Sequence, residues 1–276
     1  MTINVNSDLC LQCGICSKVC PMGIIDPADE VQLPRVHEGM DAVCFSCGHC
    51  EAFCPSGALT FTDMGDKAHE SVISKGVISP ENLGLFLKSR RSIRTYKPIE
   101  VPHATIESIL DIVRYAPSGG NTQLVEWLVI HDPRVVREIA EQTIDWEREV
   151  AKSSLPMASM DSAMVAAWDK GNDVICRGAP HIILALMDED KVMSMGDVIM
   201  GDPIIALTYF EIAAQAFGIG TCWAGVLLIA SQNRSSILEY LNLPEGRRIV
   251  NAMFFGYPQY APQFIPRRNP PHVTWR

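Results

Sequence analysis

The sequence predicts two units of different kinds, a small cysteine-rich unit followed by a larger domain of mixed helices and strands. Eight of the ten cysteines lie within the first 54 of 276 residues. The segment up to Asp66 has two basic residues against nine acidic ones, and so carries seven of the nine net negative charges. The rest of the chain is nearly neutral, and its ~200 residues are enough for one sizeable apolar core.

The cysteines follow one spacing that occurs twice. Residues 10–21 read CLQCGICSKVCP, and residues 44–55 read CFSCGHCEAFCP. Disulfides are disfavoured because the start, MTINVNSDLCLQC, has no basic region followed by an apolar one, so the chain is expected in a reducing cytoplasm. A structural zinc site usually takes two CxxC-type pairs separated by a longer stretch. Three cysteines at CxxCxxC, with a fourth before proline, instead favour a [4Fe-4S] cluster.

Two copies of this motif predict two clusters that exchange one ligand each. Three thiolates on a tight loop can hold one cluster, while the fourth cysteine points away and is free to bind the other. The expected ligands of one cluster are Cys10, Cys13, Cys16 and Cys54, and those of the other are Cys44, Cys47, Cys50 and Cys20. Residues 1–65 thus resemble a bacterial two-cluster ferredoxin. So short a segment can hardly build a sufficient apolar core, which would make the clusters its structural centre.

Charge and hydropathy narrow the partners of the chain. The acidic first segment suggests docking to a basic protein, and the alternative is that the acids only keep a small domain soluble. The net charge of −9 and the lack of a basic stripe argue against nucleic-acid binding. The longest apolar run, IIALTYFEIAAQAFGIG at 204–220, contains Glu211 and small polar residues, so no membrane span is expected. We therefore expect a cytoplasmic protein.

The larger domain is predicted over 81–276, after a glycine- and serine-containing linker at 66–80. Apolar spacing predicts helices near 80–91, 101–118 and 203–217, and a mainly helical stretch over 132–175. Short apolar runs predict strands at 125–130, 180–187, 221–228 and 248–258.

Two of these segments call for more detail. Asp202 and Pro203 are expected to supply the N-cap and the first-turn proline of the helix at 203–217. Because that helix is apolar nearly all round, it should lie in a core or a subunit interface. Residues 153–164, SSLPMASMDSAM, are expected to be an exposed loop and helix start, with a mobile lid as the alternative.

The first candidate ligand-binding segment is KSRRSIRTY at 88–96. It places three guanidinium groups and a hydroxyl within five residues, on Arg90, Arg91, Ser92 and Arg94. Guanidinium groups match phosphate oxygens, and a bound phosphate would offset their mutual repulsion. Arg267 and Arg268 in the tail form a second possible phosphate clamp. The alternative in both places is a solvated basic stretch.

The second candidate segment is APSGGNTQ at 116–123, where a predicted helix gives way to two glycines. Glycines let a ligand approach the backbone, and the amides of Asn121 and Gln123 offer donors and acceptors to a heterocycle. The stretch also fits an ordinary helix-ending loop. A third segment, GIGTCWAG at 218–225, follows a helix and lacks the last glycine of GxGxxG, so no Rossmann site for NAD is predicted.

Together these segments resemble the FMN-dependent nitroreductase family. The resemblance covers roughly 81–276, through RRSIRTY, PSGGNTQ, GIGTCWAG and IPRR. It implies an α+β fold with a central sheet wrapped by helices, FMN as cofactor, and an interlocked homodimer. By this resemblance the FMN phosphate would be held by Arg90, Arg91, Ser92, Arg94 and Arg267 or Arg268. The isoalloxazine ring would lie against Ser118, Gly119, Asn121 and Gln123, and its reactive edge against the backbone of Ala224 and Gly225.

The combination predicts an oxidoreductase in which clusters feed a flavin. A cluster moves one electron at a time, whereas a flavin can collect two and deliver them as a hydride. Electrons from a ferredoxin-like protein or NAD(P)H would pass through the clusters to FMN, and then to a nitroaromatic, quinone or similar acceptor. NAD(P)H docking directly over the flavin is also possible. No catalytic side chain is predicted, and Cys176 and Cys222 are expected to be core cysteines.

Two alternative functions remain open. The chain could be an electron-transfer adaptor between partner proteins, with FMN as a relay and no small-molecule turnover. It could also be a family variant with flavin-fragmenting or reductive dehalogenating chemistry. An open pocket over the flavin would favour an enzyme, and a substrate-specific lid would favour the variant chemistry.

Overall fold

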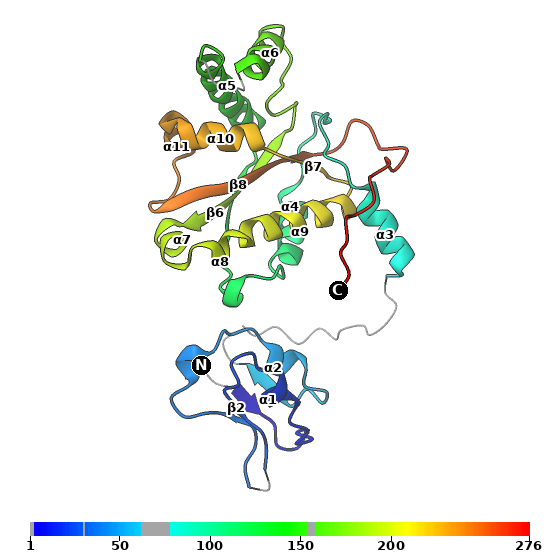
Figure 1. Ribbon diagram of the computed structural model, residues 1–276, viewed down its shortest axis with the longest axis vertical. Coiled ribbons are helices and arrows are strands. Elements are labelled where there is room, and N and C mark those ends of the chain that lie inside the picture. The colour runs from blue at the N-terminus through cyan, green and yellow to red at the C-terminus, as the bar shows by residue number, and fades with distance from the viewer. Residues whose placement is uncertain (1–2, 30, 62–77, 154–157) are drawn as a thin grey trace. The chain divides into compact units, whose positions relative to one another are not determined.

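The computed structural model describes residues 3–29, 31–61, 78–153 and 158–276, which divide into two compact units (Figure 1). The small unit is formed by the described residues up to Phe61, and Gly120–Thr122 are grouped with it. The large unit comprises Ile78–Gly119 and the described residues from Gln123 onward. Most of the predicted linker, residues 66–77, lies outside the described residues.

The small unit contains short elements around a small core. Strand β1 (Ile3–Val5) pairs with β4 (Leu59–Phe61), and β2 (Ile25–Asp26) pairs with β3 (Arg35–Val36), both antiparallel. The helical elements are α1 (Ile15–Val19), η1 (Asp41–Val43) and α2 (His49–Ala52). The buried core residues are Cys16, Ile24, Ile25, Cys50, Leu59 and Phe61. Two of these six are cysteines, so the core cannot be separated from the cysteine motifs.

The large unit is built on a four-stranded antiparallel sheet of order β5-β6-β8-β7. The strands are β5 (Glu126–Ile130), β6 (His181–Asp188), β8 (Arg247–Gly256) and β7 (Gly220–Trp223). All but the last residue of β6 are buried. Ile182, Leu184 and Leu186 enter one core cluster, whereas Ile183 and Ala185 enter another. This burial on both faces explains the continuous apolar sequence of β6, and the strand predicted at 180–187 is confirmed.

Helices cover both faces of this sheet, as Figure 1 shows. One face packs against α5 (Pro133–Val150), α6 (Ala158–Asp169), α10 (Gly225–Asn233) and α11 (Ser235–Leu241). The other packs against α4 (His103–Val113) and α9 (Asp202–Ala216). The remaining helical elements are α3 (Pro80–Ser89), η2 (Gly119–Asn121), α7 (Glu189–Met195) and α8 (Asp197–Met200). The expected α+β fold with a helix-wrapped sheet is therefore confirmed.

The apolar helix expected at 203–217 is α9, and only one side of it packs in the core. Leu207, Phe210 and Ala214 are fully buried, whereas Ile204 and Tyr209 are 48% and 38% exposed. Within the described part of the chain, no helix is long and apolar enough to cross a membrane. Of the possible lid at 153–164, residues 154–157 lie outside the described residues, and α6 begins at Ala158.

The predicted strand at 221–228 is wrong in its second half. Strand β7 ends at Trp223, and helix α10 begins at Gly225. The buried residues of α10 are Leu227, Ala230 and Ser231, which have the i, i+3, i+4 spacing of one helix face. The short apolar run VLLIA does not distinguish a strand from a buried helix, and tertiary burial decides for the helix.

The predicted N-cap at Asp202 is also wrong. The helix is capped by Gly201, and Asp202 is its first residue, with no side-chain cap hydrogen bond. The Asp202 carboxylate instead accepts a hydrogen bond from the backbone N–H of Gly119, at 3.0 Å to Oδ1. The Asp202 carboxylate, which local sequence predicts as an acceptor for the helix N-terminus, therefore binds a residue 83 positions away instead.

Two carboxyl groups are buried together between α5 and α6. Glu147 is 3% exposed and Asp161 is 2% exposed. Glu147 Oε2 and Asp161 Oδ2 have no hydrogen-bond partner among the described residues. Burial raises the pKa of Glu147 from 4.5 to about 7, and the hydrogen bond with Asp161 contributes to this shift. The pair therefore retains a proton close to neutral pH.

This shared proton predicts a dependence of stability on pH. The folded chain keeps a proton that the unfolded chain releases, so stability should fall as pH rises from about 4.5 to about 7 and then level off. The Glu147→Gln variant should flatten this dependence, removing up to about 3 kcal/mol of it. Urea unfolding at several pH values between 4.5 and 8 measures the effect. The control, Glu141→Gln, changes an exposed glutamate of the same helix and should keep the wild-type slope. An unchanged slope in Glu147→Gln would contradict the shared proton.

Candidate functional site

The two cysteine motifs adopt the same backbone conformation. Gln12 and Ser46 hold the same place in each motif, and both have a φ of 50°. Two positions later, Gly14 and Gly48 have φ values of 68° and 70°, and a short helix follows each. Glycine adopts this left-handed region without strain. Concave loops of this kind point backbone N–H groups inward and stabilise negative charge, as at many iron–sulfur sites.

The cysteines of the two motifs line two cavities. The cysteines of the first cavity are Cys20, Cys44, Cys47 and Cys50. The cysteines of the second are Cys10, Cys13, Cys16 and Cys54. The remaining walls are largely apolar and include Ile24, Ile25 and Phe61 in one, and Val5, Ile15 and Leu59 in the other. Each cavity thus receives three cysteines of one motif and the last cysteine of the other, the grouping that exchanged ligands require.

The spacing between thiolates differs between a single zinc ion and an iron–sulfur cluster. A tetrahedral zinc draws its thiolates to about 2.3 Å from one point. In the part of the chain that the structure describes, no three His, Cys, Asp or Glu side chains are grouped closely enough to hold one metal ion. A cluster of several irons spreads its thiolates farther apart. Burial raises the pKa of Cys50 to about 11, so binding iron there would release a proton.

In the large unit, the RRSIRTY segment lies along the edge strand of the sheet. Ser92 forms a parallel bridge with Thr221, and the backbone N–H of Ile93 donates to the Thr221 carbonyl at 2.8 Å. Strand β7 then runs directly into Ala224 and Gly225. Two of the predicted FMN-binding segments, far apart in sequence, therefore lie side by side.

A glycine makes this approach possible. A Cβ on Gly220 would lie 2.4 Å from Ile93 Cγ1 and 2.9 Å from Pro258 Cγ, closer than real contacts allow. The strand and the segment can therefore pack at this distance because Gly220 has no side chain.

Cationic groups gather at a cavity of about 460 Å³ beside this edge. Arg90, Arg91 and Lys97 line it together with Glu211 and Gln215. The pKa of Arg91 is lowered, first by desolvation and then by the charges of Arg268 and Arg90. A guanidinium whose charge is opposed by two neighbouring guanidinium groups favours a bound anion, and the donor set suits a phosphate.

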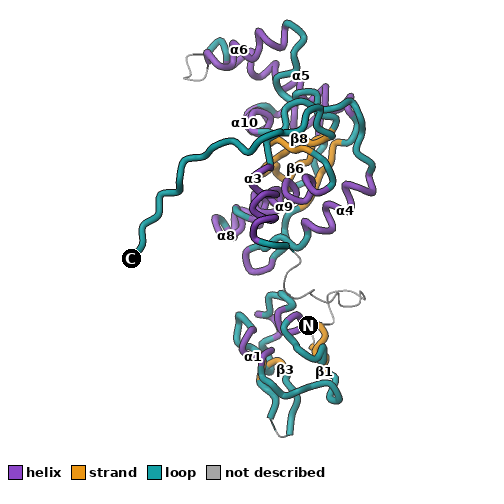
Figure 2. The backbone as a smooth tube through the Cα atoms, turned by 90° about the vertical axis from the view of Figure 1, so that its right-hand side faces the viewer, coloured by secondary structure: helices purple, strands orange, loops and turns teal. Residues whose placement is uncertain are grey.

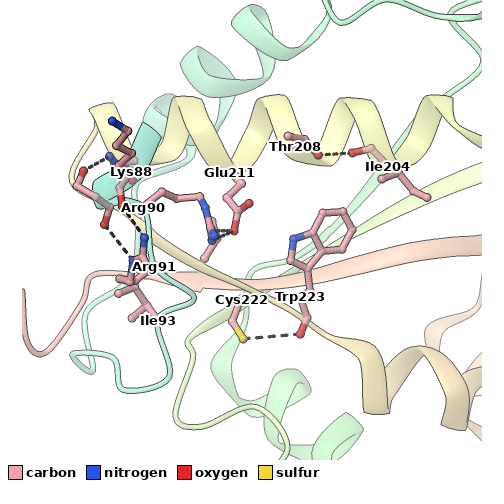
Figure 3. Close-up of polar contacts among 12 residues, drawn as sticks. Lys88, Arg90, Arg91, Ile93, Ile204, Thr208, Glu211, Cys222 and Trp223 are labelled. Carbon is pink, nitrogen blue, oxygen red and sulfur yellow. Dashed lines mark hydrogen bonds and ion pairs between the residues drawn. The ribbon is translucent and has the colours of Figure 1, made fainter. Parts of the chain in front are cut away.

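Helix α9 anchors this arginine segment. Arg90 Nη1 lies 2.8 Å from Glu211 Oε1, and Figure 3 shows the Arg90 side chain reaching to Glu211 on the helix. One turn further, Gln215 Nε2 donates to the Phe86 carbonyl at 2.8 Å and to Ser89 Oγ at 3.1 Å. Sequence reasoning missed both residues. The signal for Glu211 was its position as the one acidic residue inside an apolar run.

The PSGGNTQ segment is held at the opposite end of α9. Besides the contact of Gly119 with Asp202, the Gln123 N–H donates to Ser118 Oγ at 3.0 Å. Asn121 and Gln123 have φ values of 54° and 50°, in the left-handed region. Asp202 and Glu211 are nine residues apart, about 13 Å along the helix axis. A single chain therefore places the PSGGNTQ and arginine segments at separate ends of this helix.

The other predicted residues are distributed differently. Arg94 does not line the cavity but lies near Cys222, where its charge lowers a thiol pKa that burial raises. In the tail, the charge of Arg268 contributes to lowering the pKa of Arg91. Nη1 of Arg268 donates to the Arg267 carbonyl at 3.1 Å. Cys176 and Cys222 are 1% and 6% exposed, which confirms that they are core cysteines.

The nitroreductase family model matches residues 87–257, and a 4Fe-4S dicluster domain model matches residues 9–59. The first match covers more than half of the chain, and the sheet with its two helical layers is the fold of such a reductase. The chain belongs to the nitroreductase family. It is an oxidoreductase of that family with an N-terminal 4Fe-4S dicluster domain, as expected from the two motifs.

Individual proteins are similar to this chain over much of its length. A protein of Archaeoglobus fulgidus named "Putative NADH dehydrogenase/NAD(P)H nitroreductase" is 25% identical over 64% of this chain and 85% of its own length. Iodotyrosine deiodinase of Nematostella vectensis is 23% identical over 62% of this chain and 65% of its own length. A structure of an FMN-bound nitroreductase from Desulfitobacterium hafniense is similar with a TM-score of 0.54 and 19% identity, over 71% of this chain and 95% of that one.

The close packing at Gly220 predicts the effect of a single methyl group. Gly220→Ala should destabilise the protein by about 1–3 kcal/mol, because the added Cβ must displace Ile93 or Pro258. Urea unfolding measures this loss. The matched control is Gly201→Ala, where a Cβ meets nothing within 4 Å and the backbone is already helical, so stability should be unchanged or slightly raised. If both variants unfold like the wild type, the segment does not pack on β7 as described.

Proposed function

We propose that this protein is a flavin-dependent reductase in which two [4Fe-4S] clusters deliver single electrons to FMN for the reduction of a small electrophile, such as a nitroaromatic or a quinone. The observation that carries the proposal is that a nitroreductase-family chain arranges eight cysteines as two quartets around two cavities. A reductase fed only by NAD(P)H at its flavin needs no such quartets. The proposal assigns the clusters to residues 1–65 and the flavin to 81–276, with a linker at 66–80.

The residues of the chain have separate tasks in this scheme. When bound, the clusters pass electrons singly, and FMN accepts them and delivers two to the acceptor. The guanidinium groups of Arg90, Arg91 and Arg268 supply donors for the FMN phosphate. The backbone at Gly225 is exposed, with nothing within 4 Å of the position of a Cβ, so a planar ring can approach it closely. Gly119, the residue proposed from the PSGGNTQ segment, packs against Val198 and donates its N–H to Asp202. The further FMN-binding residues of the proposal are Ser92, Arg94, Ser118, Asn121, Gln123, Ala224 and Arg267.

The flavin site is proposed to form between two copies of the chain. The arginine segment and the PSGGNTQ segment lie at separate ends of α9, so a second copy can bring one segment to the other. Apolar side chains are exposed where a partner would pack, with Ile204 on α9 at 48% and Leu85 on α3 at 59%. Residues 259–276 form a tail without helix or strand that is exposed throughout, including Trp275 at 90% (Figure 2). Burying these surfaces favours a homodimer.

The relatives suggest two variations on this function. The Archaeoglobus protein is named for NAD(P)H, which supports direct reduction of the flavin as a second inlet. Iodotyrosine deiodinase is named for removal of a halogen, which supports reductive dehalogenation as a second candidate reaction. Both variations can be tested in one experiment by varying the donor and the acceptor.

Ligand exchange predicts the iron content of paired cysteine variants. Cys16→Ala/Cys54→Ala removes two ligands of one proposed cluster, so one cluster of about four irons should remain. Cys16→Ala/Cys20→Ala removes one ligand from each cluster, so both should be lost or weakened. The two pairs are matched, because each combines Cys16 with the final cysteine of a motif. Iron and sulfide analysis of the reconstituted proteins measures the outcome. If the first pair loses both clusters and the second keeps one, each motif binds its own cluster.

The route of the electrons predicts which donor depends on the clusters. Protein reconstituted with iron, sulfide and FMN is reduced anaerobically with reduced ferredoxin or with NADPH while flavin absorbance is followed. Ferredoxin should reduce the wild type but not a Cys10→Ala/Cys47→Ala variant, which loses one proposed ligand from each cluster. A nitroaromatic, a quinone or a halogenated phenol should then reoxidise the flavin.

Two results would contradict this scheme. In the first, the cluster-deficient variant turns over fully with NADPH and the wild type does not respond to ferredoxin. Electrons would then not enter the protein through the clusters. A reduced flavin that none of the three acceptors reoxidises, but a second redox protein does, would instead indicate an electron-transfer adaptor.

A further inference from the structure

A single carboxylate lies at the junction of three elements of the large unit. Glu211 belongs to α9 and is 6% exposed. Its Oε1 lies 2.8 Å from Arg90 Nη1 and 3.4 Å from Thr221 Oγ1 on β7. The neighbouring buried positions of this helix face are apolar, among them Leu207, Phe210 and Ala214. A carboxylate in such a place loses much of its hydration, so its hydrogen bonds must compensate for that loss.

The ion pair with Arg90 uses one part of a larger donor group. A guanidinium has five N–H donors in a rigid fork, and Glu211 accepts from Nη1. The Arg90 side chain remains 32% exposed and lines the 460 Å³ cavity. Glu211 therefore restricts the rotation of Arg90 while leaving other donors of the same group available to a ligand in the cavity.

The charge around the cavity remains positive despite this carboxylate. Arg91 and Lys97 line the same cavity as Arg90, and the charge of Arg268 contributes to lowering the pKa of Arg91. Four cationic groups thus stand against the one carboxylate of Glu211. A phosphate monoester carries about −1.5 to −2 charges at neutral pH, so it can bind here without exceeding the positive charge.

We infer that Glu211 is a positioning residue for the phosphate of FMN, holding Arg90 in the orientation in which its free N–H groups face that phosphate. This inference rests on the proposed binding of FMN and adds a residue that the phosphate itself does not touch. Two effects of Glu211 have opposite sign. Its negative charge repels a phosphate, whereas its ion pair removes the conformational freedom that Arg90 would otherwise lose on binding. The second effect prevails, so the ion pair of Glu211 with Arg90 strengthens phosphate binding.

Binding of two flavins to the apoprotein tests this inference. Riboflavin has the ring and sugar chain of FMN without the phosphate, so the ratio of the two affinities isolates the phosphate contribution. Fluorescence quenching titrations should show that Glu211→Gln binds FMN about tenfold more weakly, a loss of about 1.4 kcal/mol. Its affinity for riboflavin should not change. A role in stability alone would leave the ratio at the wild-type value.

Two further variants show whether Glu211 acts through Arg90. Arg90→Met should lower FMN affinity by itself, and adding Glu211→Gln should then cause no further loss. Glu211→Asp keeps the charge but withdraws the carboxylate by one methylene, so it should lose part of the preference for FMN. It also serves as the test variant if Glu211→Gln does not fold. The control Glu239→Gln, an exposed site on α11, should bind both flavins like the wild type.

The outcomes separate this inference from the proposed function. Unchanged or tighter FMN binding by Glu211→Gln overturns the inference, and tighter binding would show that repulsion by the carboxylate prevails. Equal weakening of FMN and riboflavin overturns it too, because the effect would then lie outside the phosphate. If the wild type itself binds neither flavin, the proposed function fails first, and a preference for riboflavin over FMN would remove the phosphate site.

Discussion

The large unit depends on the pairing of β6 with β8, because both strands are buried on both faces of the sheet. Such a pair is stable only if a helical layer covers each face. Helix α9 belongs to one of these layers, and its direction is set by the apolar residues that it buries there. The two ends of α9 then hold Gly119 through Asp202 and Arg90 through Glu211. The hydrophobic packing of one helix thereby places both candidate ligand-binding segments.

The small unit obeys a different constraint. Its apolar core contains few residues, and two of them are cysteines. Left-handed glycines at matching positions give both motifs the same loop, so each loop presents its cysteines to a cavity in the same way. The large unit is stabilised by burial of apolar surface. The small unit buries few apolar residues, so metal ligation would have to supply much of its stability. One chain therefore combines a fold stabilised by its core with a fold that would be stabilised by its cofactors.

The features that sequence predicted well are those that depend on neighbours in the chain. The 4Fe-4S dicluster domain at 9–59 followed from the doubled spacing of the cysteines, because a tight loop limits which thiolates can converge. The strands at 180–187 and 248–258 followed from continuous apolar runs. Prediction failed where a distant partner decided the structure. The Asp202 carboxylate accepts a hydrogen bond from Gly119, 83 positions away, and the Glu211 carboxylate accepts one from Arg90, 121 positions away. The run after Trp223 became a helix because its apolar side chains face the core at helical spacing, a distinction that so short a run does not carry.

The arginine cluster also matters for how the protein is handled. A cavity lined by Arg90 and Arg91 attracts small dianions of many kinds, and inorganic phosphate or sulfate offers the same oxygens as a flavin phosphate. If the FMN phosphate binds there as proposed, these ions compete with it for the same donors, and dissolved salt weakens the attraction further. Purification in a phosphate buffer at high ionic strength should therefore favour loss of flavin. An amine buffer of low ionic strength should favour its retention, so the choice of buffer affects the flavin content of the purified protein.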